Sequence, residues 1–556
     1  MEERRLLLAV ALSLLVLTGY QLLFPPKHPP RPAPSPSAAP AAPATLASAP
    51  DAPRAAPLPP PSSVPTPAVA DDHERRVEAQ GADLSVAFTN RGARLVSWRL
   101  PRFTDARGRA EEMVESVVGG PRPLDIETGD PAVDERLRGA LFRPSAESLV
   151  LSGAGPQELR FEYSGDGLKA SKTVSFPPAG YFVSISASVQ QEGRPLPIKI
   201  LWGPGVGNPT AAEMEVQGYQ PPHAVALTAA GVERPAVDKV GPLRALPQAQ
   251  WAGIESHYFA ALFVPPPGGG TEIRTLTLSG DGDKTRLLPQ AAVVLPGAEA
   301  RAGLYVGPKD YPTLAREGHD LAKVVPVGEW IGPIVVPLMK LLNWVHGHVG
   351  NYGWSIVALT VLINVAMSPL RHYSIANGVK MAKLSPEMKV IQERYRKVPA
   401  LDPKRQEMQK EIGALYERHG MSMGTQMAVG CLPLLLTMPF LIAFYRVLQV
   451  SIELRGSPFL WIPDLSQKDP LFVTPVLMGI SMFAMQRMTP STMDPAQQRM
   501  MMIMPLVLVV MFFAAPSGLN LYWLASNVCS IIQQGVTLRL IRGAEAEPGG
   551  RDRRKR

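Results

Sequence analysis

Cysteine is almost missing from this sequence. The 556 residues include only Cys431 and Cys529, and both lie inside apolar segments. The remaining, more polar segments therefore have no disulfide framework and no cysteine-based metal site. The redox state of the compartment is left open by this composition.

Motifs for nucleotides and nucleic acids are also missing. No glycine-rich phosphate-binding loop marks an ATP-driven machine. The net charge of +8 could suit a nucleic acid, but no cluster combines basic residues with aromatic residues that stack on bases. The basic residues instead gather beside apolar runs, which is the charge pattern of membrane topology, and no direct nucleic-acid partner is predicted.

Catalytic constellations are incomplete. The sequence Ala515-Pro516-Ser517-Gly518 resembles the serine loop of an intramembrane protease, but no histidine follows His419 to activate the serine. His346 and His348 have a spacing seen in metal sites, yet no nearby carboxylate or thiol completes a ligand set. We predict no catalytic residue, no metal site and no cofactor.

Long apolar runs are present from the start of the chain. Residues 6–24 give 19 nearly unbroken apolar positions, about 28 Å as a helix, which is close to the hydrocarbon thickness of a bilayer. A retained anchor over residues 1–24 is favoured over a cleaved signal peptide, because no small-residue cleavage site follows Phe24. The segment from Pro25 to Pro67 has 17 prolines in 43 residues, so residues 25–76 are expected to form a Pro/Ala-rich disordered tether.

Residues 77–325 change to short alternating runs separated by Gly/Pro turns. These runs include LSVAFTN (84–90), KTVSF (172–176), YFVSISASV (181–189) and EIRTLTL (272–278). Alternation with period two and few helical repeats predict strands that pack into one large β-sandwich.

The chain becomes strongly apolar after Pro326. Residues 326–350 mix Trp, His, Lys and Gly with apolar residues, which favours an amphipathic helix in the membrane interface. Clearer spans follow, and with the anchor they make six; these five are expected at 351–371, 424–450, 471–488, 499–515 and 518–540.

Charge sets the predicted orientation. The segment 372–423 and its border with the second span carry many Lys and Arg residues, Arg371 included, and the tail 541–556 ends in RDRRKR. The segment 451–470 has only Arg455 and Lys468. The positive-inside rule places both termini in the cytoplasm and residues 25–350 in the periplasm, if the host has two membranes.

The segment 372–423 has a helical pattern of its own. Apolar residues recur at steps of three and four, VPALDP interrupts them, and Asp402 can cap the second helix; the apolar positions are Met381, Leu384, Met388, Ile391, Tyr395, Met408, Ile412 and Leu415. This predicts a cytoplasmic helical hairpin with one apolar seam. Its basic faces suit either a solvated pair of helices or a platform for a ribosome, a nascent chain or acidic lipid.

Polar residues interrupt several spans. Thr360 and Asn364 share one helix face at spacing i, i+4, and Asn520, Trp523 and Asn527 share another at i, i+3, i+7. Hydrogen bonds that lock the bundle would explain some of them, at about 0.6 kcal/mol each. The number of amides on two faces favours a wet cavity instead.

Several long motifs resemble one known family. GCLPLLLTMPFLIAFYRVL (430–448), SPFLWIPDLSQKDP (457–470), MQRMTPSTMDPAQQRMMMIMP (485–505) and PSGLNLYWLASNVCSIIQQ (516–534) are similar to the YidC/Oxa/Alb membrane-protein insertases, in the Gram-negative form with a large periplasmic domain. YGWSIVALT (352–360) and AFTNRGARLVSWRL (87–100) extend the resemblance. It implies an N-terminal anchor and a five-helix insertase core, together a membrane α-helical bundle, and a periplasmic all-β supersandwich.

The resemblance also implies a hydrophilic groove in the core. Thr360 and Thr437 fall at polar groove positions, and Trp523 falls where the family has an aromatic residue. Asn364 occupies the position where the family usually has an arginine, which is a departure. Together with the residues from the helix pattern, the candidate substrate groove comprises Thr360, Asn364, Thr437, Asn520, Trp523 and Asn527.

The implied function is insertion and folding of inner-membrane proteins by a non-enzymatic insertase and chaperone, alone or with the Sec translocon. Nascent membrane proteins, the lipid bilayer and a ribosome bound by the basic tail or the hairpin are the implied partners. Two other classes stay open: a small-solute transporter or channel, although no internal repeat is visible, and a carbohydrate enzyme on a membrane anchor.

Overall fold

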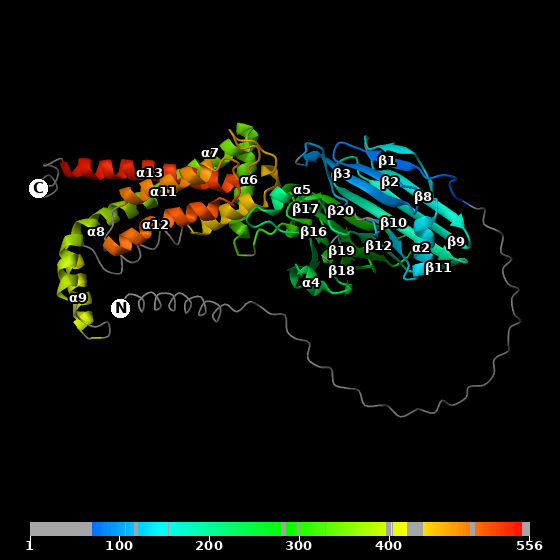
Figure 1. Ribbon diagram of the computed structural model, residues 1–556, viewed down its shortest axis with the longest axis horizontal. Coiled ribbons are helices and arrows are strands. Elements are labelled where there is room, and N and C mark those ends of the chain that lie inside the picture. Colours follow the sequence, from blue (N-terminus) through cyan, green and yellow to red (C-terminus); the bar gives the residue numbers. More distant parts are fainter. Residues whose placement is uncertain are drawn as a thin grey trace, which may run out of the picture. The chain divides into compact units, whose positions relative to one another are not determined.

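The computed structural model describes most of the chain between residues 69 and 546. The described range omits residues 106, 116–119, 154, 280–284, 298–299, 329, 396–397, 399–401, 403, 420–437 and 490–494. The predicted anchor, most of the tether, the first part of the third span with Thr437, and the last ten residues lie outside it. Two domains follow along the described chain: a β domain up to Val325 and a helical domain after it (Figure 1).

Three sheets form the β domain. One has the strand order β4 (Ala110–Glu112), β3 (Arg94–Thr104), β2 (Ser85–Thr89), β1 (Arg76–Gln80), β7 (Ser148–Val150). The largest has the order β14 (Gly231–Glu233), β13 (His223–Thr228), β16 (Trp251–Glu255), β17 (Phe259–Val264), β20 (Ala302–Pro308), β10 (Phe182–Gln191), β9 (Leu168–Phe176), β8 (Gln157–Gly165), β6 (Arg143–Pro144), with β11 (Arg194–Pro195) on β10. The third has the order β15 (Arg244–Leu246), β18 (Gly270–Ser279), β19 (Thr285–Leu295), β12 (Ile198–Trp202), β5 (Ile126–Glu127).

The alternating runs form the predicted strands because one face of each is buried. In β10, Val183, Ile185, Ala187 and Val189 are buried, and the residues between them are half-buried. The three sheets share one core, in which Trp98 of the first sheet contacts Phe176 of the second and lies edge-on to Trp202 of the third at 5.8 Å between ring centroids. The predicted β-sandwich is confirmed.

The β domain begins earlier than predicted. Val69 pairs with Ser164, and the amide of Asp71 donates to the carbonyl of Leu141 at 3.0 Å. The boundary at residue 77 was placed by the first alternating run, and the charged residues before it have no strand pattern. They are ordered by hydrogen bonds to distant backbone, which leave no trace in local sequence.

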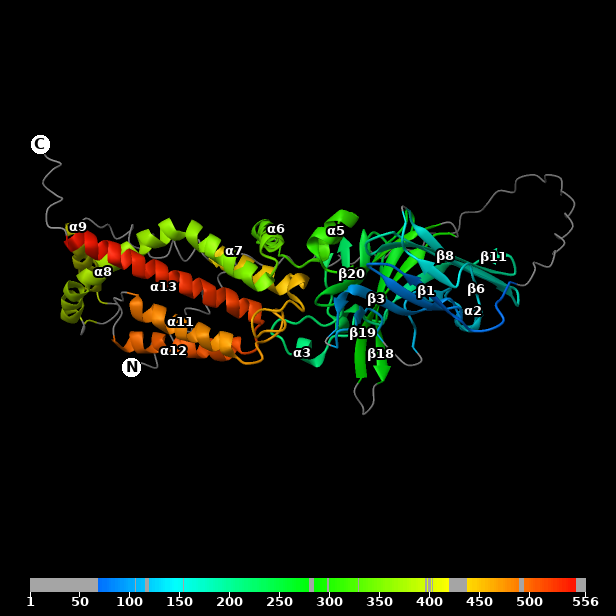
Figure 2. The ribbon, with the colours of Figure 1, turned by 90° about the horizontal axis from the view of Figure 1, so that it is seen from above.

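Helices occur in both domains. Short helices α2 (Pro131–Gly139), α3 (Ala211–Met214), α4 (Val237–Val240) and α5 (Tyr311–Glu317) and the 3-10 turn η1 (Leu321–Val324) belong to the β domain. The helical domain contains α6 (Gly332–Val349), α7 (Tyr352–Ala366), α8 (Ser368–Arg394), α9 (Lys404–Arg418), a helix at Met438–Val450, the 3-10 turn η2 (Ile452–Leu454), α11 (Val473–Met488), α12 (Pro495–Phe512) and α13 (Ser517–Ala546). In Figure 2, α13 runs beside α7 and α11, and α11 beside α12, as their contacts also show.

Among the described residues, no single helix is long and apolar enough to cross a bilayer. Together α7 and α8 have the length and composition to do so, and they meet at an angle of 60°. The number of spans therefore stays a prediction.

The second predicted span ends before its expected limit. It was placed at 351–371, but α7 ends at Ala366 and α8 begins at Ser368 with Pro369 in its first turn. Proline starts a new helix readily because its missing amide hydrogen is not needed there. Arg371 and His372, counted in the sequence at the border of a cytoplasmic loop, therefore lie in the first turns of a helix.

The hairpin seam is confirmed. Leu384 and Met388 of α8 pack with Ile412, Leu415 and Tyr416 of α9, and Met381, Ile391 and Met408 lie against this cluster. Asp402 Oδ1 accepts a hydrogen bond from the amide of Lys404 at 2.9 Å, as expected of a helix cap. The pattern of apolar residues alone was enough to predict this contact.

One buried charge in the β domain gives a testable pH dependence. Lys172 of β9 is fully buried, and its Nζ donates to the carbonyls of Ala93 at 2.7 Å and Leu124 at 2.6 Å. Burial lowers the pKa of Lys172 to about 8. Between pH 8 and the ordinary value of 10.5, the unfolded chain binds a proton that the folded chain has lost, so stability rises with pH in this window.

We therefore expect the wild type to gain about 2 to 3 kcal/mol of unfolding free energy between pH 8 and pH 10 relative to Lys172→Met. Unfolding of the full chain in detergent at both pH values measures the difference. Lys169→Met is the matched control, because Lys169 is exposed on the same strand. Parallel pH profiles for the wild type and Lys172→Met would contradict the assignment.

Candidate functional site

The polar face of α7 is buried in the helical domain. Thr360 and Asn364 are both buried, one turn apart. Thr360 Oγ1 donates to the carbonyl of Ile356 at 2.6 Å, and Asn364 Nδ2 donates to the carbonyl of Thr360 at 2.8 Å. Asn364 Oδ1 has no hydrogen-bond partner in the described structure. Half of the amide is therefore left unsatisfied.

Asn364 lies at the same depth as Asn527 of α13. A methyl group placed on Gly518 would lie 3.6 Å from Ile356 Cδ1, which fixes the register of the two helices near their first turns. From there Asn364 is about 12 Å further along α7, and Asn527 is about 13.5 Å further along α13. The helices run in the same direction, because Arg371 at the start of α8 bonds to Ser530 of α13.

The polar residues of α13 bond mainly to neighbouring helices. Asn520 Nδ2 donates to the carbonyl of Phe512 at the end of α12, at 3.2 Å, and Asn527 Nδ2 donates to Ser481 Oγ of α11, at 3.0 Å. Trp523 lies edge-on to Phe512, with ring centroids 5.0 Å apart. These contacts lock α11, α12 and α13 together, as expected of interhelical hydrogen bonds. The described part of the chain shows no hydrogen bond between the polar side chains of α7 and those of α13.

Four buried polar atoms in this region lack a partner within the described residues. They belong to α7, α8 and α13, and they are Asn364 Oδ1, Asn377 Nδ2, Asn520 Oδ1 and Gln533 Oε1. In a dry bundle each would cost roughly 1 to 3 kcal/mol, since nothing replaces its lost hydrogen bond to water. Four such atoms in these helices fit a wet interior better than a dry one.

Arg371 is the functional candidate that the sequence analysis missed. It is half-buried near the start of α8, and its Nη1 donates to Ser530 Oγ at 2.6 Å. No Asp or Glu occurs in residues 352–375, 473–488, 495–512 or 517–540, which form the neighbouring helix segments. The guanidinium thus faces α13 without a carboxylate from these helices, about 4.5 Å beyond the depth of Asn527. Its neighbour His372 contacts Thr537 Oγ1 of α13 at 3.1 Å.

We call Thr360, Asn364, Arg371, Trp523 and Asn527 the polar seam. This definition keeps four of the residues predicted from sequence and adds the arginine that bonds to Ser530 of α13. Asn520 lies closer to the start of α13 and mainly holds the end of α12. Thr437 lies outside the described residues, so its predicted place in the groove stays a prediction.

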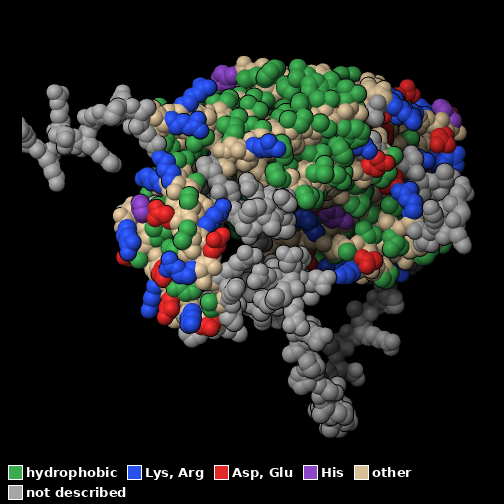
Figure 3. All heavy atoms as spheres, turned by 60° about the vertical axis from the view of Figure 1, so that its left-hand side comes forward, with side chains coloured by type: hydrophobic (Ala, Val, Ile, Leu, Met, Phe, Trp, Pro, Cys, Tyr) green, Lys and Arg blue, Asp and Glu red, His purple; other side chains and the backbone are tan. Residues whose placement is uncertain are grey.

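The outside of the helical domain is strongly apolar. Exposed apolar side chains occur on all four helices that surround the polar seam, among them Val365, Ile480, Leu506, Val510, Ile532 and Val536. Figure 3 shows a broad apolar face with charged side chains mostly at its margins. An apolar face of this kind on the outside of a helical domain fits contact with lipid.

One end of the polar seam is covered by residues 451–470, which we call the outer loop. Phe459, Ile462 and Leu465 of this loop are buried. Ser517 Oγ, at the start of α13, donates to the carbonyl of Gln467 at 2.7 Å, and the amide of Gly518 donates to Leu465 at 2.8 Å. The hydroxyl of Ser517 is therefore used in loop packing.

The histidine pair does not form a shared site. The ring of His346 stacks on Tyr352, with centroids 3.7 Å apart, whereas His348 contacts Trp344 and bonds to its carbonyl at 2.8 Å. The two rings thus have different neighbours.

Comparison with protein families gives two matches that together cover most of the chain. The model described as the YidC periplasmic domain matches residues 76–341, and the model described as the 60Kd inner membrane protein matches residues 344–544. The first covers nearly all of the β domain and the first part of α6, and the second covers the end of α6 and the helices after it.

Relatives match over nearly their full length. The membrane protein insertase YidC of Geobacter metallireducens is 34% identical, with 98% of this chain and 100% of that protein covered. The protein of the same name from Syntrophus aciditrophicus is 32% identical, with 96% and 98% covered, and that of Campylobacter jejuni is 28% identical, with 96% of each covered.

Solved structures give more distant likenesses. An active YidC insertase with its first transmembrane domain resolved is 17% identical, with 85% of this chain and 94% of that chain covered and a TM-score of 0.34. YidC from Thermotoga maritima is 13% identical, with 85% and 100% covered and a TM-score of 0.30. A putative mutarotase from Salmonella typhimurium matches 43% of this chain and 93% of its own at 10% identity, with a TM-score of 0.27.

Proposed function

Because this chain belongs to the YidC family of membrane protein insertases, we propose that it inserts and folds inner-membrane proteins along its polar seam. The observation that carries this proposal is the set of unpartnered polar atoms in the helices of the polar seam, Asn364 Oδ1 among them, together with a half-buried arginine, in helices whose outer faces are apolar. A hydrated seam of this kind gives a path through the membrane to the polar end of a client, which is the membrane protein being inserted. The apolar part of the client can move sideways into lipid.

The free energy that drives insertion comes from the client. Each Leu, Ile, Phe or Val that enters the bilayer contributes about 0.3 to 0.6 kcal/mol, so a span of some twenty residues needs no nucleotide hydrolysis. The protein lowers the barrier for the polar end, because water and amide groups in the polar seam replace part of the apolar path. We propose no catalytic residue and no cofactor for this step.

Arg371 adds a charge to this path. Holding a cation at mid-membrane costs roughly 2.5 to 3.5 kcal/mol, so a half-buried arginine with no carboxylate on the neighbouring helix segments is a strong functional candidate. We propose that it attracts acidic segments of clients into the polar seam. Asn364, at the family's usual arginine position, then helps to keep the polar seam hydrated, while Arg371 on the next helix supplies the positive charge.

The surroundings and partners follow from charge and from the family. We propose an inner-membrane location, with the basic hairpin and tail in the cytoplasm and the β domain outside. Under this orientation the hairpin α8–α9 and the tail are available to a ribosome or to acidic lipid. A Sec translocon is the other proposed partner, and nascent membrane proteins are the clients.

Site-specific crosslinking tests the polar seam. A photo-crosslinking residue at 360, 364, 523 or 527 is expected to crosslink a client with one span, stalled during insertion in cells. Leu362 and Val365 of α7 give matched control positions, because both are exposed on the outside of the same helix. Equal client crosslinking from the control positions and the polar seam, or crosslinks from the polar seam to lipid alone, would contradict the proposal.

Asn364→Leu is expected to reduce insertion of clients with charged outer tails by about two- to tenfold, because the polar seam loses a hydrogen-bonding group worth roughly 0.5 to 1.5 kcal/mol. Asn364→Arg is expected to be tolerated, because the arginine also holds water. Insertion rates of clients that differ only in tail charge measure both effects. If Asn364→Leu inserts charged tails at the wild-type rate, Asn364 is only structural.

A further inference from the structure

The outer loop connects the helical domain to the β domain. On one side it packs on the first turns of α7 and α13: Asn351 Nδ2 donates to the carbonyl of Pro458 at 2.9 Å, and Ser517 and Gly518 bond to Gln467 and Leu465. On its other side it meets α3 and β4 of the β domain. The loop is therefore held between the end of the polar seam and the β domain.

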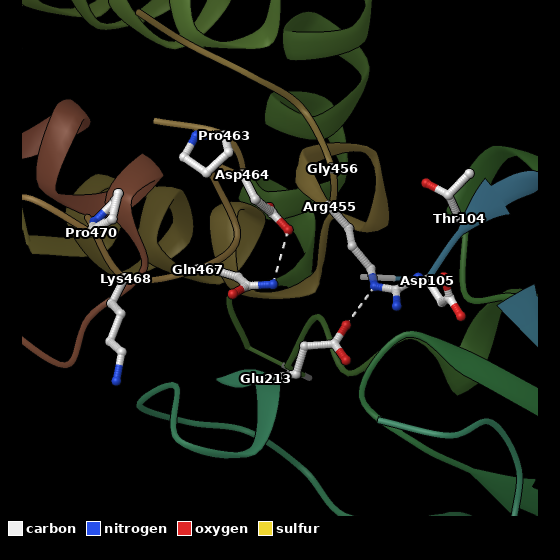
Figure 4. Close-up of a pocket in the computed structure, with 10 residues that line it drawn as sticks. All are labelled: Thr104, Asp105, Glu213, Arg455, Gly456, Pro463, Asp464, Gln467, Lys468 and Pro470. Carbon is white, nitrogen blue, oxygen red and sulfur yellow. Dashed lines mark hydrogen bonds and ion pairs between the residues drawn. The ribbon is translucent and has the colours of Figure 1, made fainter. Parts of the chain in front are cut away.

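Arg455 makes the central contact. Its Nε donates to Glu213 Oε1 at 2.7 Å and its Nη2 to Glu111 Oε2 at 2.8 Å, and all three side chains are at most 8% exposed. The guanidinium also lies over the rings of Tyr258 and Phe259, 5.9 and 5.4 Å from their centroids. One cation of the helical domain thus binds two carboxylates of the β domain, and Figure 4 shows the pair with Glu213.

The short helix α3 presents one of these carboxylates. Glu213 Oε2 accepts hydrogen bonds from the amide and hydroxyl of Thr210, which begins the helix, and Oε1 is left for Arg455. Just after α3, the amide of Gln217 donates to the carbonyl of Ala514, between α12 and α13, at 3.0 Å. The same short segment therefore touches both loops at this end of the helical domain.

The contact has features of a joint that opens. The three buried groups carry a net charge of −1, and burial raises the pKa of Glu111, so the cluster is poorly neutralised. A cavity of about 400 Å³ adjoins Arg455 and is lined by polar and charged residues, including Asp105, Asp464 and Lys468 (Figure 4). Separated charges can be hydrated there, which lowers the cost of opening.

We infer that Arg455, Glu111 and Glu213 form a latch through which the β domain holds the outer loop over the end of the polar seam, and that the latch opens when a client's polar tail passes outward. This inference rests on the proposed function. It adds a role for the β domain: control of the exit from the polar seam. It also assigns Arg455 as a positioning residue that contacts no client.

The first experiment measures closure of the latch. Cysteines at Gln217 and Ala514, with Cys431 and Cys529 replaced by serine, are joined in membranes by a short bis-maleimide. Arg455→Met is expected to lower the crosslinking yield by at least about threefold, because two buried carboxylates lose their shared cation. Lys468→Met is the matched control, since Lys468 pairs with Glu215 at the same junction but the two are 39% and 65% exposed.

A second variant keeps this test decisive if Arg455→Met does not fold. Glu213→Gln keeps an oxygen that accepts the hydrogen bonds from Thr210 but removes one of the two negative charges that bind Arg455. The crosslinking yield is expected to fall, by less than in Arg455→Met. An unchanged yield in Glu213→Gln and, where it folds, in Arg455→Met would overturn the latch.

The second experiment tests the link to insertion. The crosslinked protein is expected to translocate clients with long polar outer tails at least about tenfold more slowly than the uncrosslinked protein, and to insert clients without such tails at an unchanged rate. A cleavable crosslinker should restore the rate on cleavage. Equal rates for long tails before and after crosslinking would overturn the gating role. Failure of the uncrosslinked protein to insert any client would instead count against the proposed function itself.

Discussion

Arg371→Met is expected to slow insertion of clients with acidic outer tails by about tenfold or more, while clients with neutral tails stay within about twofold of the wild type. Two opposite unit charges 8 Å apart attract by roughly 2 kcal/mol at an effective dielectric constant of 20, and 1.4 kcal/mol is a factor of ten. The guanidinium is half-buried and hydrogen-bonded to Ser530, with no Asp or Glu on the neighbouring helix segments to compete for it.

The measurement compares insertion rates of clients that differ only in tail charge, in membranes carrying equal amounts of each variant. Arg371→Lys should retain most of the activity, because it keeps the positive charge. Arg446→Met is the matched control: Arg446 is also half-buried, but it bonds to Gln449 in the helix before the outer loop, at the opposite end from Arg371. An equal slowing of acidic and neutral tails by Arg371→Met would show that Arg371 supports the fold and attracts no client.

The position of Arg371 also bears on the departure at Asn364. An insertase with an amide at the family's usual arginine position still has a half-buried cation, because the bend after α7 directs Arg371 toward α13. The sequence did not reveal this. Positions 364 and 371 are seven apart, and in one straight helix they would share a face, but the 60° bend decides where that face points.

Much of the fold was predictable because its causes are local. Alternation of apolar residues gave β9, β10 and β18, and steps of three and four gave the seam in which Leu384 and Met388 meet Ile412. The latch could not be predicted in this way. Arg455 is 242 residues from Glu213 and 344 from Glu111, and a single sequence gives no sign of pairing at such distances.

The largest effect on stability is expected from a second buried ion cluster, in the β domain. Glu255, at the end of β16, accepts a hydrogen bond from Lys309 Nζ at 2.9 Å and from Arg234 Nε at 2.6 Å, and contacts His223 Nε2 at 3.1 Å. Lys309 is only 3% exposed. Glu255→Gln leaves this lysine without its counterion, so we expect a loss of about 3 to 5 kcal/mol in the free energy of unfolding.

Two comparisons show whether the loss of stability in Glu255→Gln comes from the uncompensated charge of Lys309 or from altered packing. Glu272→Gln removes one partner of the pair Lys199–Glu272, whose lysine is 34% exposed and can be hydrated, so it should cost at most about 1 kcal/mol. Adding Lys309→Met to Glu255→Gln should recover part of the loss, because the uncompensated lysine is gone. Denaturant unfolding of the full chain, followed by a signal from the β domain, measures all three. A loss no larger for Glu255→Gln than for Glu272→Gln would contradict the prediction.

The same carboxylate predicts a pH dependence. Burial alone raises the pKa of Glu255, but Lys309, His223 and Arg234 outweigh it and hold the pKa at about 2. Because this is below the ordinary 4.5, the carboxylate stabilises the fold above pH 4.5, and its contribution falls as the pH drops toward 2. Glu255→Gln should therefore flatten the loss of stability in this window.

Glu255 is also tied to the latch. It directly precedes the turn that carries Tyr258 and leads to Phe259, the two rings beneath the guanidinium of Arg455. Loosening this turn is expected to lower the crosslinking yield between positions 217 and 514 in Glu255→Gln, even where the β domain stays folded. If the yield falls only when the β domain unfolds, Glu255 stabilises the domain without acting on the latch.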